Sequence, residues 1–441
     1  MAFIKSALAF SLLTFNLIFS PVFNGCDYDP LVSEMLAEAK PSRWTDWMKA
    51  LSGAEPIYTQ DGEEKILTRS SLVLFEPDRS PSAFNYLLDE LVLLGFKEGE
   101  DFQVHTYDFP YQDRYPERNW KNIILTFPGY DPEFEHERVL FVAHMDSTSE
   151  QELLLAPGAD DNASGTAGLL EAAAVFRQYR FRRTINLVWF SGEEKFRIGS
   201  KSFVEDYADW IPDIVGVVNM DMIAYDGDKD RCFEVHAGTL PGSQEIGNCI
   251  GSVINAYDLG LTFDFIDDST AYRLSDHLPF WQQDVPAVML FENFFYQPEE
   301  TCGQPGRNFT YHTARDTMTY INQSYGFSVL QAGIGTVAHL AQPIEPCFSD
   351  NLQVTAELNG HKLRLNWTLL ADEGAQYQVW AKDEVRWQLL GETAGTEWVI
   401  SFNPDIEPTT FRVTAISRSG CQSKPAEVSP TDYFSFDKIP K

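Results

Sequence analysis

Histidines and carboxylates recur along this chain where apolar runs end. The residues that could bind metal are, in chain order, His144, Asp161, Glu194, Asp221 and His312. Neutral imidazole and carboxylate oxygen are ligands that zinc accepts, and a pair of zinc ions needs several such ligands and a shared bridge. Two metals a few ångströms apart would activate a bridging water and polarise a carbonyl. The residue types and their order therefore predict a two-metal hydrolytic centre.

Some of these acidic positions have a predicted role beyond simple ligation. Asp161 lies in a tight turn before a helix, where Gly158 and Gly165 give the backbone freedom, so it is placed to bridge two metals. Glu193 and Glu194 are adjacent at a strand end, so their side chains diverge. One can bind metal while the other faces the water, and a carboxylate in reach of that water is a general base.

Two further aspartates follow the predicted histidine ligands. Asp146 lies two residues after His144, and Asp316 lies four residues after His312. Either carboxylate could orient its histidine through the second ring nitrogen. A lone pattern of this kind is usually surface chemistry. Asp221 is harder to dismiss, because an unpaired carboxylate in an apolar strand is costly.

Strands and helices alternate through the middle of the chain. Strands are predicted at 102–107, 122–127, 138–143, 184–190, 215–222 and 285–291, and helices at 82–95, 163–179 and 325–340. This alternation predicts an α/β fold with a mostly parallel central sheet and helices on both faces. Ligand sites in such folds lie at the carboxyl ends of the strands, where several candidate ligands are found.

The pattern changes after residues 343–346. Segments 362–368, 376–381, 387–390, 398–402 and 410–416 alternate apolar and polar residues, with turns between them. This period of two predicts a C-terminal β-sandwich over 346–432. Trp367, Tyr377 and Val379 resemble the core pattern of a fibronectin type III domain. We interpret this part as an adhesion or spacer module, since it carries no histidine and carboxylate cluster.

The first residues predict export. Lys5 precedes an apolar run, so residues 1–25 are interpreted as a signal peptide. Cys26 then resembles the lipid-accepting cysteine of a bacterial lipoprotein, with simple secretion as the alternative. Either way, we expect a periplasmic, cell-surface or extracellular protein. The net charge of −32 disfavours nucleic acid and anionic membranes as partners, because the summed field repels polyanions.

The cysteines leave the disulfide pairing ambiguous. Apart from Cys26 they are Cys232, Cys249, Cys302, Cys347 and Cys421, an odd number. Cys347 with Cys421 is the most attractive pair, because these two residues flank the C-terminal segment.

The motifs over roughly residues 70–342 resemble the leucyl-aminopeptidase-like family of secreted di-zinc peptidases. The resemblance implies peptide substrates, two zinc ions and a zinc exopeptidase fold, with a zinc peptidase domain over 27–345. By matching position, it implies that Asp161 bridges the metals, that His144 and Asp221 complete one site, and that Glu194 and His312 complete the other.

The resemblance also assigns supporting roles. Glu193 would be the general base, Asp146 would support His144, and the peptide bond after Asp161 would be cis. Tyr272, three residues before Ser275, matches a tyrosine that helps to stabilise the oxyanion in some members.

One departure keeps other functions open. The residues after Glu194, Lys195 to Ile198, differ from the family's pattern and resemble the related glutaminyl cyclases, which share the fold and bind one zinc. The turn at 160–165 and the Asp316-Thr317 ending favour the peptidase. An aminopeptidase is therefore the leading hypothesis, and a glutaminyl-peptide cyclotransferase with a single zinc is the alternative. A non-catalytic peptidase-like binding protein is a third, disfavoured by the intact set of candidate residues.

Overall fold

The computed structural model describes residues 25–59, 62–76, 82–108, 119–294, 301–302, 307–359, 362–370, 374–382, 387–401, 410–417 and 420–429. The predicted signal peptide, apart from Gly25, lies outside these residues. So do the last positions, 430–432, of the predicted C-terminal domain.

An eight-stranded mixed sheet forms the centre of the molecule, in the order β10-β9-β11-β8-β5-β7-β4-β3. The strands are β3 (Phe102–Asp108), β4 (Asn119–Phe127), β5 (Arg138–His144), β7 (Thr184–Phe190), β8 (Ile214–Met220), β9 (Cys232–His236), β10 (Thr262–Ile266) and β11 (Ala287–Glu292). The four central strands, β11, β8, β5 and β7, are parallel to one another. Strands β4 and β9 pair antiparallel at the two flanks. The predicted α/β fold is confirmed, with its parallel part in the middle of the sheet.

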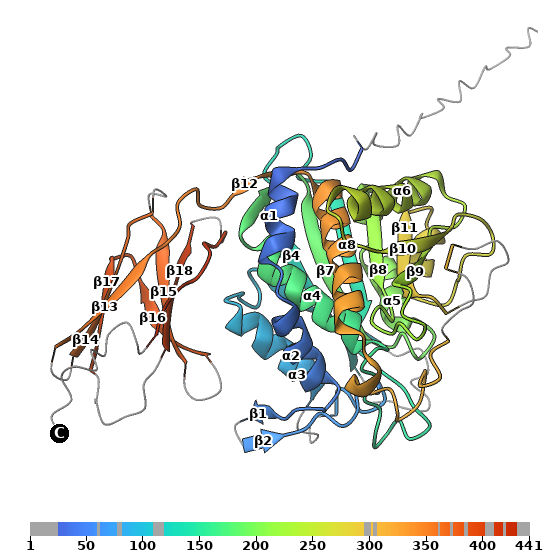
Figure 1. Cartoon of the computed structure of the whole chain (residues 1–441), viewed down its shortest axis with the longest axis horizontal. Coiled ribbons are helices and arrows are strands. Elements are labelled where there is room, and N and C mark those ends of the chain that lie inside the picture. The colour runs from blue at the N-terminus through green and yellow to red at the C-terminus, as the bar shows by residue number, and fades with distance from the viewer. Residues whose placement is uncertain are drawn as a thin grey trace, which may run out of the picture.

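Helices cover both faces of this sheet (Figure 1). One core contains Val139 and Phe141 of β5 together with α4 (Ala163–Phe176), α6 (Pro241–Ala256) and α8 (Gln323–Ala341). The other contains Leu140 and Val142 with α5 (Ile198–Asp206) and α7 (Leu278–Trp281). Successive residues of β5 thus enter opposite cores, which explains why this strand is apolar throughout.

The N-terminal segment contains the helix predicted at 82–95, observed as α3 (Ala83–Leu93), and further elements that the sequence analysis did not predict. Helices α1 (Pro30–Glu38) and α2 (Pro41–Leu51) pack on the α4 and α8 side, followed by the hairpin β1 (Ile57–Thr59) and β2 (Gly62–Glu64) and by α3. Short 3-10 turns occur at Ile211–Asp213 and Met318–Tyr320. Asp29 accepts a hydrogen bond from the Leu31 N–H at 2.7 Å and precedes Pro30, which is a recognisable helix start.

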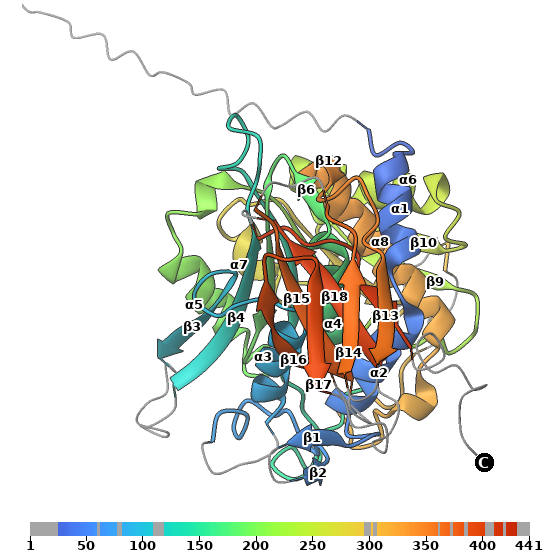
Figure 2. The same cartoon turned by 90° about the vertical axis from the view of Figure 1, so that its left-hand side faces the viewer.

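Two small antiparallel sheets form the C-terminal part (Figure 2). One contains β13 (Val354–Asn359), β14 (Lys362–Trp367) and β17 (Glu397–Ser401). The other contains β15 (Gln376–Lys382), β16 (Trp387–Thr393), β18 (Thr410–Ile416) and β19 (Ala426–Val428). Leu363, Leu365 and Tyr377, from both sheets, share one core, as a β-sandwich requires. Before it, β12 (Pro343–Pro346) pairs with β6 (Tyr179–Phe181) of the first domain. The fibronectin type III assignment remains a prediction.

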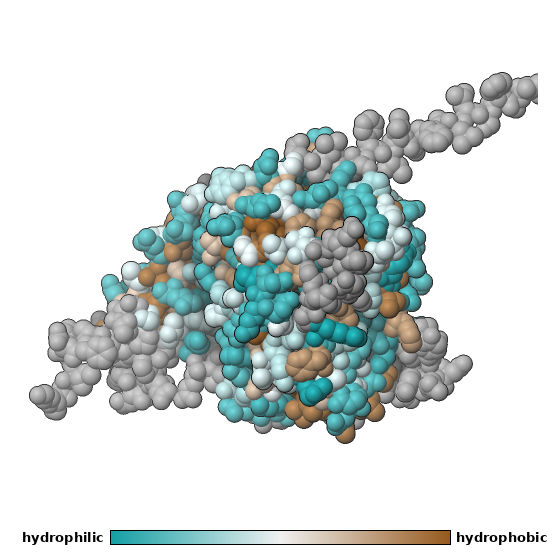
Figure 3. Space-filling model, turned by 45° about the vertical axis from the view of Figure 1, so that its right-hand side comes forward, coloured by the Kyte–Doolittle hydropathy of each residue, from teal (hydrophilic) through white to brown (hydrophobic). Residues whose placement is uncertain are grey.

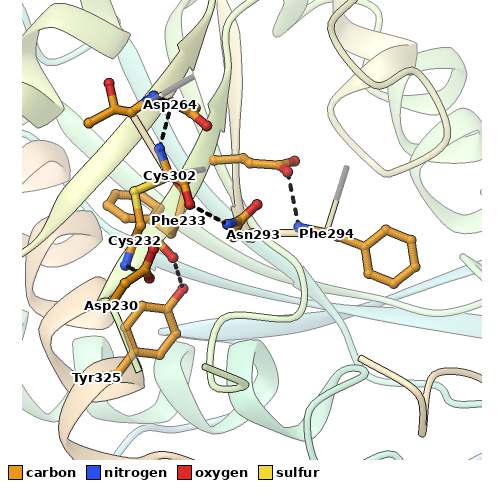
Figure 4. The surroundings of a disulfide bond; sticks show 10 residues. Asp230, Cys232, Phe233, Asp264, Asn293, Phe294, Cys302 and Tyr325 are labelled. Carbon is orange, nitrogen blue, oxygen red and sulfur yellow. Dashed lines mark hydrogen bonds between the residues drawn. A yellow bond between two sulfur atoms is a disulfide. The ribbon is translucent and has the colours of Figure 1, made fainter. Parts of the chain in front are cut away.

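Three disulfides join distant parts of the chain. The expected pair Cys347–Cys421 is present, together with Cys26–Cys249 and Cys232–Cys302. Without Cys26 the cysteines were odd in number, and Cys26 pairs with Cys249 to complete three disulfides. A lipid at Cys26 is incompatible with this structure, because the same sulfur is already bonded to Cys249. Figure 4 shows how the Cys232–Cys302 disulfide links β9 to the chain beyond β11.

The surface is largely hydrophilic on the face seen in Figure 3, as the acid-rich composition predicts. Among the described helices, none is both long enough and apolar enough to cross a bilayer.

Candidate metal centre

Asp161 lies between the two predicted histidine ligands. Its Oδ1 atom is 3.4 Å from Nε2 of His144, and its Oδ2 atom is 3.3 Å from Nε2 of His312. Asp221 Oδ1 lies 3.2 Å from the same His144 nitrogen, and Glu194 Oε2 lies 3.0 Å from the His312 nitrogen. The five residues thus form two groups that could each hold a metal ion, and Asp161 belongs to both. The structure brings together all five predicted ligands.

Strand ends and tight loops deliver these side chains. His144 is the last residue of β5, and Asp221 directly follows β8. Asp161 occupies the turn before α4, where Gly158 has φ +51°. Asn162 caps α4 by accepting from the Gly165 N–H at 2.9 Å. The predicted cis peptide between Asp161 and Asn162 is confirmed.

Hydroxyl and amide groups hold the two aspartates nearest His144. Ser275 Oγ donates to Asp221 Oδ2 at 2.6 Å and accepts from the side-chain amide of Asn219 at 2.7 Å. The Asp146 carboxylate accepts from Ser71 Oγ at 2.7 Å and from the Glu193 N–H at 3.2 Å. These hydrogen bonds fix both carboxylates, and Ser275 leaves Oδ1 of Asp221 facing His144.

Asp146 contacts the second ring nitrogen of His144 through its main-chain carbonyl, whereas its carboxylate was expected to do so. Nδ1 of His144 lies 3.1 Å from the main-chain carbonyl of Asp146 and 3.5 Å from its Oδ1 atom. A contact at Nδ1 fixes the ring so that Nε2 faces Asp161 and Asp221.

Asp316 does not orient His312, contrary to the sequence-based expectation. Its carboxylate accepts from the main-chain N–H groups of Asp160 at 3.0 Å and Asp161 at 3.0 Å. It therefore positions the turn that carries Asp161. The spacing from His312 was misleading, because the residues between them form a turn that directs the Asp316 side chain to the main chain of residues 160–161.

Arg69 is a supporting residue that the sequence analysis missed. Its side chain is fully buried and donates to the main-chain carbonyls of Met145, Pro157 and Gly158. One guanidinium therefore clamps the loop after β5 to the turn before α4. A single arginine between short polar residues carries no spacing signal that could have revealed this role.

The charges in the site favour a cation. Burial raises the pKa of Glu194 to about 7, with Asp161 adding to the rise. Burial opposes a charge on His312, yet Asp161 and Glu194 raise its pKa to about 11. For His144 burial also opposes the charge, but Asp221 and Asp146 raise its pKa well above the usual value. These shifts describe a strongly negative pocket that binds positive charge, and metal ions would replace the protons there.

Glu193 stands beside the two groups. Burial raises the pKa of its carboxyl group well above the usual range, and Asp221, Asp276 and Glu194 add to the rise while His144 opposes it. Within the described residues its carboxylate has no hydrogen-bond donor. Glu193 is thus near the candidate ligands and free to accept a proton.

Aromatic side chains border the site. The Tyr311 ring stacks on His312 with ring centroids 3.7 Å apart, and Tyr272 stacks on Phe291 at 5.9 Å. Burial raises the pKa of Tyr272 to about 12, and Asp221, Glu193 and Asp161 contribute. Tyr272 is therefore a neutral O–H donor within the field of the candidate ligands at ordinary pH.

Residues 122–327 match the family model described as "Peptidase family M28". This segment is therefore similar to peptidase family M28. Leucine aminopeptidase 1 from Trichophyton equinum is 28% identical over 232 residues, covering 50% of this chain and 58% of that protein. Leucine aminopeptidase 1 from Sclerotinia sclerotiorum is 25% identical over 281 residues, covering 60% and 67%. The chain thus spans 58% of the length of the first of these relatives.

Solved structures share the fold seen here. The LapA aminopeptidase of Legionella pneumophila is 21% identical with a TM-score of 0.54, covering 71% of this chain and 75% of that one. A glutaminyl cyclase from an Acidobacteriales bacterium is 18% identical with a TM-score of 0.51, covering 69% and 95%. At these identities the likeness concerns the fold alone, so the two activities must be separated by the site.

Proposed function

We propose that this protein is a zinc aminopeptidase that removes N-terminal residues from peptides. The observation that carries the proposal is the placement of Asp161, whose two oxygens face two different histidines at 3.4 and 3.3 Å. A carboxylate in this position can be shared by two metal ions. The leucine aminopeptidase relatives support the same reading.

The residues present fit a pair of zinc ions. His144 and Asp221 would hold one ion and Glu194 and His312 the other, with Asp161 shared. Nitrogen and carboxylate oxygen donors suit zinc, and the buried negative charge requires cations. When bound, such ions supply Lewis-acid polarisation of the scissile carbonyl and a water of lowered pKa.

Two residues of this chain would do the remaining chemistry. Glu193, which no described donor engages, would take a proton from the attacking water and deliver it to the leaving amine. The Tyr272 hydroxyl would donate to the oxygen on which negative charge develops. The acidic pocket would favour a substrate's protonated N-terminus, which suits an exopeptidase.

The cyclotransferase remains the second candidate. It is favoured by the fold shared with a bacterial glutaminyl cyclase and by the residues after Glu194. Phe196 in that segment is 68% exposed with φ +70°, so most of its side chain faces solvent. A single bound zinc per chain, with release of ammonia from glutaminyl peptides, would select the cyclase.

Substitution of Glu193 tests the proposal directly. We expect Glu193→Ala to lower kcat by roughly 100-fold or more while two zinc ions per chain remain bound, because a proton acceptor is lost and no ligand is removed. Metal content by mass spectrometry and turnover of aminoacyl and glutaminyl substrates are the measurements. Glu245→Ala, an exposed position on α6, is the matched control and should be fully active.

Chelation completes this test. Removal of metal should abolish activity in the parent protein and in Glu245→Ala, and zinc should restore it. Full activity in Glu193→Ala, or in the metal-free protein, would refute the proposed mechanism.

We further propose that the protein works outside the cytoplasm. Three disulfides support this, since such bonds persist mainly in oxidising compartments. Fractionation of the native host, with detection of the protein in the cytosol alone, would overturn this assignment.

A further inference from the structure

A small cavity lies where the C-terminal sandwich meets the first domain. Its volume is about 60 Å³, and three arginines line it: Arg43 from α2, Arg177 from the end of α4 and Arg412 from β18. Three guanidinium groups around one cavity are unexpected in a chain with a net charge of −32. The cavity lies apart from the candidate metal centre, because it has no lining residue in common with that centre.

Only one of these arginines has a carboxylate partner. Arg43 donates twice to buried Glu171, at 2.6 and 2.7 Å. Within the described residues, neither Arg177 nor Arg412 forms an ion pair. Asp101 favours the charged form of Arg177, and Glu427 that of Arg412, by charge interaction without a direct ion pair.

Several N–H groups of this pair are buried without an acceptor. In the described part of the chain, Nε and Nη2 of Arg177 and Nε of Arg412 have no hydrogen-bond partner. The Arg177 guanidinium instead stacks 4.8 Å above the Phe96 ring, and Arg412 lies 4.5 Å above the Trp387 ring. Aromatic stacking leaves the in-plane N–H donors unused, so they can still bind an acceptor.

The like charges oppose one another. Burial lowers the pKa of Arg412 to about 10, and Arg43 contributes to the fall although Glu427 opposes it. Burial and the neighbouring Arg412 also lower the pKa of Arg177 well below its usual value. Since guanidinium groups keep their protons at neutral pH, this region carries uncompensated positive charge.

We propose that this cavity is a binding site for a small oxyanion of the sulfate or phosphate class, which links the two domains. One water needs about 10–15 Å³ of such space, so about 60 Å³ admits a tetrahedral oxyanion. Guanidinium groups bind such anions through paired N–H donors. Thr414, Ser423 and Gln422 add polar side chains to the lining.

The position of the site gives the anion a structural role. Arg177 belongs to the first domain and Arg412 to the sandwich. Each forms a hydrogen bond across the contact between the two domains. The Arg177 carbonyl accepts from the Gln422 N–H at 3.0 Å, and Arg412 Nη2 donates to the Leu93 carbonyl at 3.4 Å. An anion between the guanidinium groups would neutralise their repulsion and strengthen the contact between the domains.

The test uses the full chain with its metal, titrated with sodium sulfate against sodium chloride at equal ionic strength. Calorimetry should show saturable binding of one sulfate that depends on the arginines, and the unfolding midpoint should rise with sulfate beyond its rise with chloride. Arg177→Gln and Arg412→Gln should each weaken sulfate binding at least tenfold and remove the sulfate-specific rise. Arg364→Gln, an exposed sandwich arginine paired with Glu397, makes the same charge change and should bind sulfate normally.

Several outcomes would overturn the proposal. These are equal effects of sulfate and chloride on the parent protein, unchanged sulfate binding in Arg412→Gln, or binding that chelation removes but the arginine substitutions do not. If Arg177→Gln fails to fold, the parent titration and Arg412→Gln still decide. Loss of sulfate binding with intact peptidase activity would leave the proposed function standing, because the two sites share no residue.

Discussion

At the scale of single residues, the site depends on what holds the ligands as much as on the ligands themselves. The Asp316 carboxylate fixes the main-chain N–H of Asp161, and Arg69 holds the Gly158 carbonyl at the start of the same turn. Both supports act on backbone groups, so they position the turn before any metal binds.

Asp316→Asn is expected to weaken metal binding roughly 10- to 100-fold, as loss of a supporting group commonly does. The amide has one acceptor oxygen, whereas the carboxylate accepts from the N–H groups of both Asp160 and Asp161. Zinc titration of the apoprotein measures the effect. Because the five candidate ligands remain, saturating zinc should restore most of the activity; a variant that binds zinc as tightly as the parent would contradict this role.

Protonation of His277 should destabilise the protein in mild acid. Burial lowers the pKa of this histidine to about 3, while in the unfolded chain it is about 6.5. Between these values only the unfolded state binds the proton, so stability falls as the pH falls. The free energy of unfolding should drop by up to about 2 kcal/mol between pH 6.5 and pH 5 on account of this group.

His277→Gln is the variant that isolates this contribution. Glutamine keeps a donor for the Tyr272 carbonyl, which His277 contacts at 2.8 Å, but does not titrate. The free energy of unfolding, measured in urea at several pH values, should therefore depend less steeply on pH for His277→Gln. Equal slopes would mean that His277 does not carry the effect.

The sequence predicted the metal-binding residues because each is a reactive type at a strand end. It could not predict the groups that hold them. Ser71 and Ser275 are ordinary hydroxyl residues until folding brings them to Asp146 and Asp221. Asp316 was expected beside His312, since sequence distance says nothing about how a turn redirects a side chain.

At the scale of elements, the central strands and the edge formed by β4 and β3 were predictable, whereas the edge formed by β9 and β10 was not. Strands β5 and β7 are buried on both faces, so their apolar runs are continuous. Strands β9 and β10 contain charged residues, Glu234 and Asp264, that become buried only through tertiary contacts. Helix α2 places charged residues among its apolar ones and is stabilised by α4, which lies far away in the sequence.

The Cys347–Cys421 disulfide should matter for stability more than for catalysis. It closes a segment of 74 residues that contains most of the sandwich, so replacing both cysteines by serine should cost about 2–4 kcal/mol of unfolding free energy. Urea denaturation measures this change. Since neither cysteine borders the candidate metal centre, kcat/KM under folding conditions should stay within about twofold of the parent. A large loss of activity in the folded variant would show that the sandwich supports the site.

At the scale of the whole molecule, negative charge dominates, while three arginines line one cavity at the contact between the two domains. A net charge of −32 favours solubility and repels polyanions. Arg177 and Arg412, at the contact between the domains, have buried N–H groups and no ion pair among the described residues, although the protein as a whole is strongly acidic. Neither property could be located from composition, because total charge gives no position.

The covalent links also decide how the folded chain would respond to stretching. With the disulfides intact, tension applied outside Cys26 and Cys421 passes through Cys249 and Cys347 without loading the loops that those bonds close. The Cys232–Cys302 bond lets the tension pass from residue 232 to residue 302 without loading residues 249–302. Between Cys26 and Cys421 the covalent path under tension therefore runs only through residues 232–249 and 302–347, and β3 to β8, including His144 and Asp161, lie off that path.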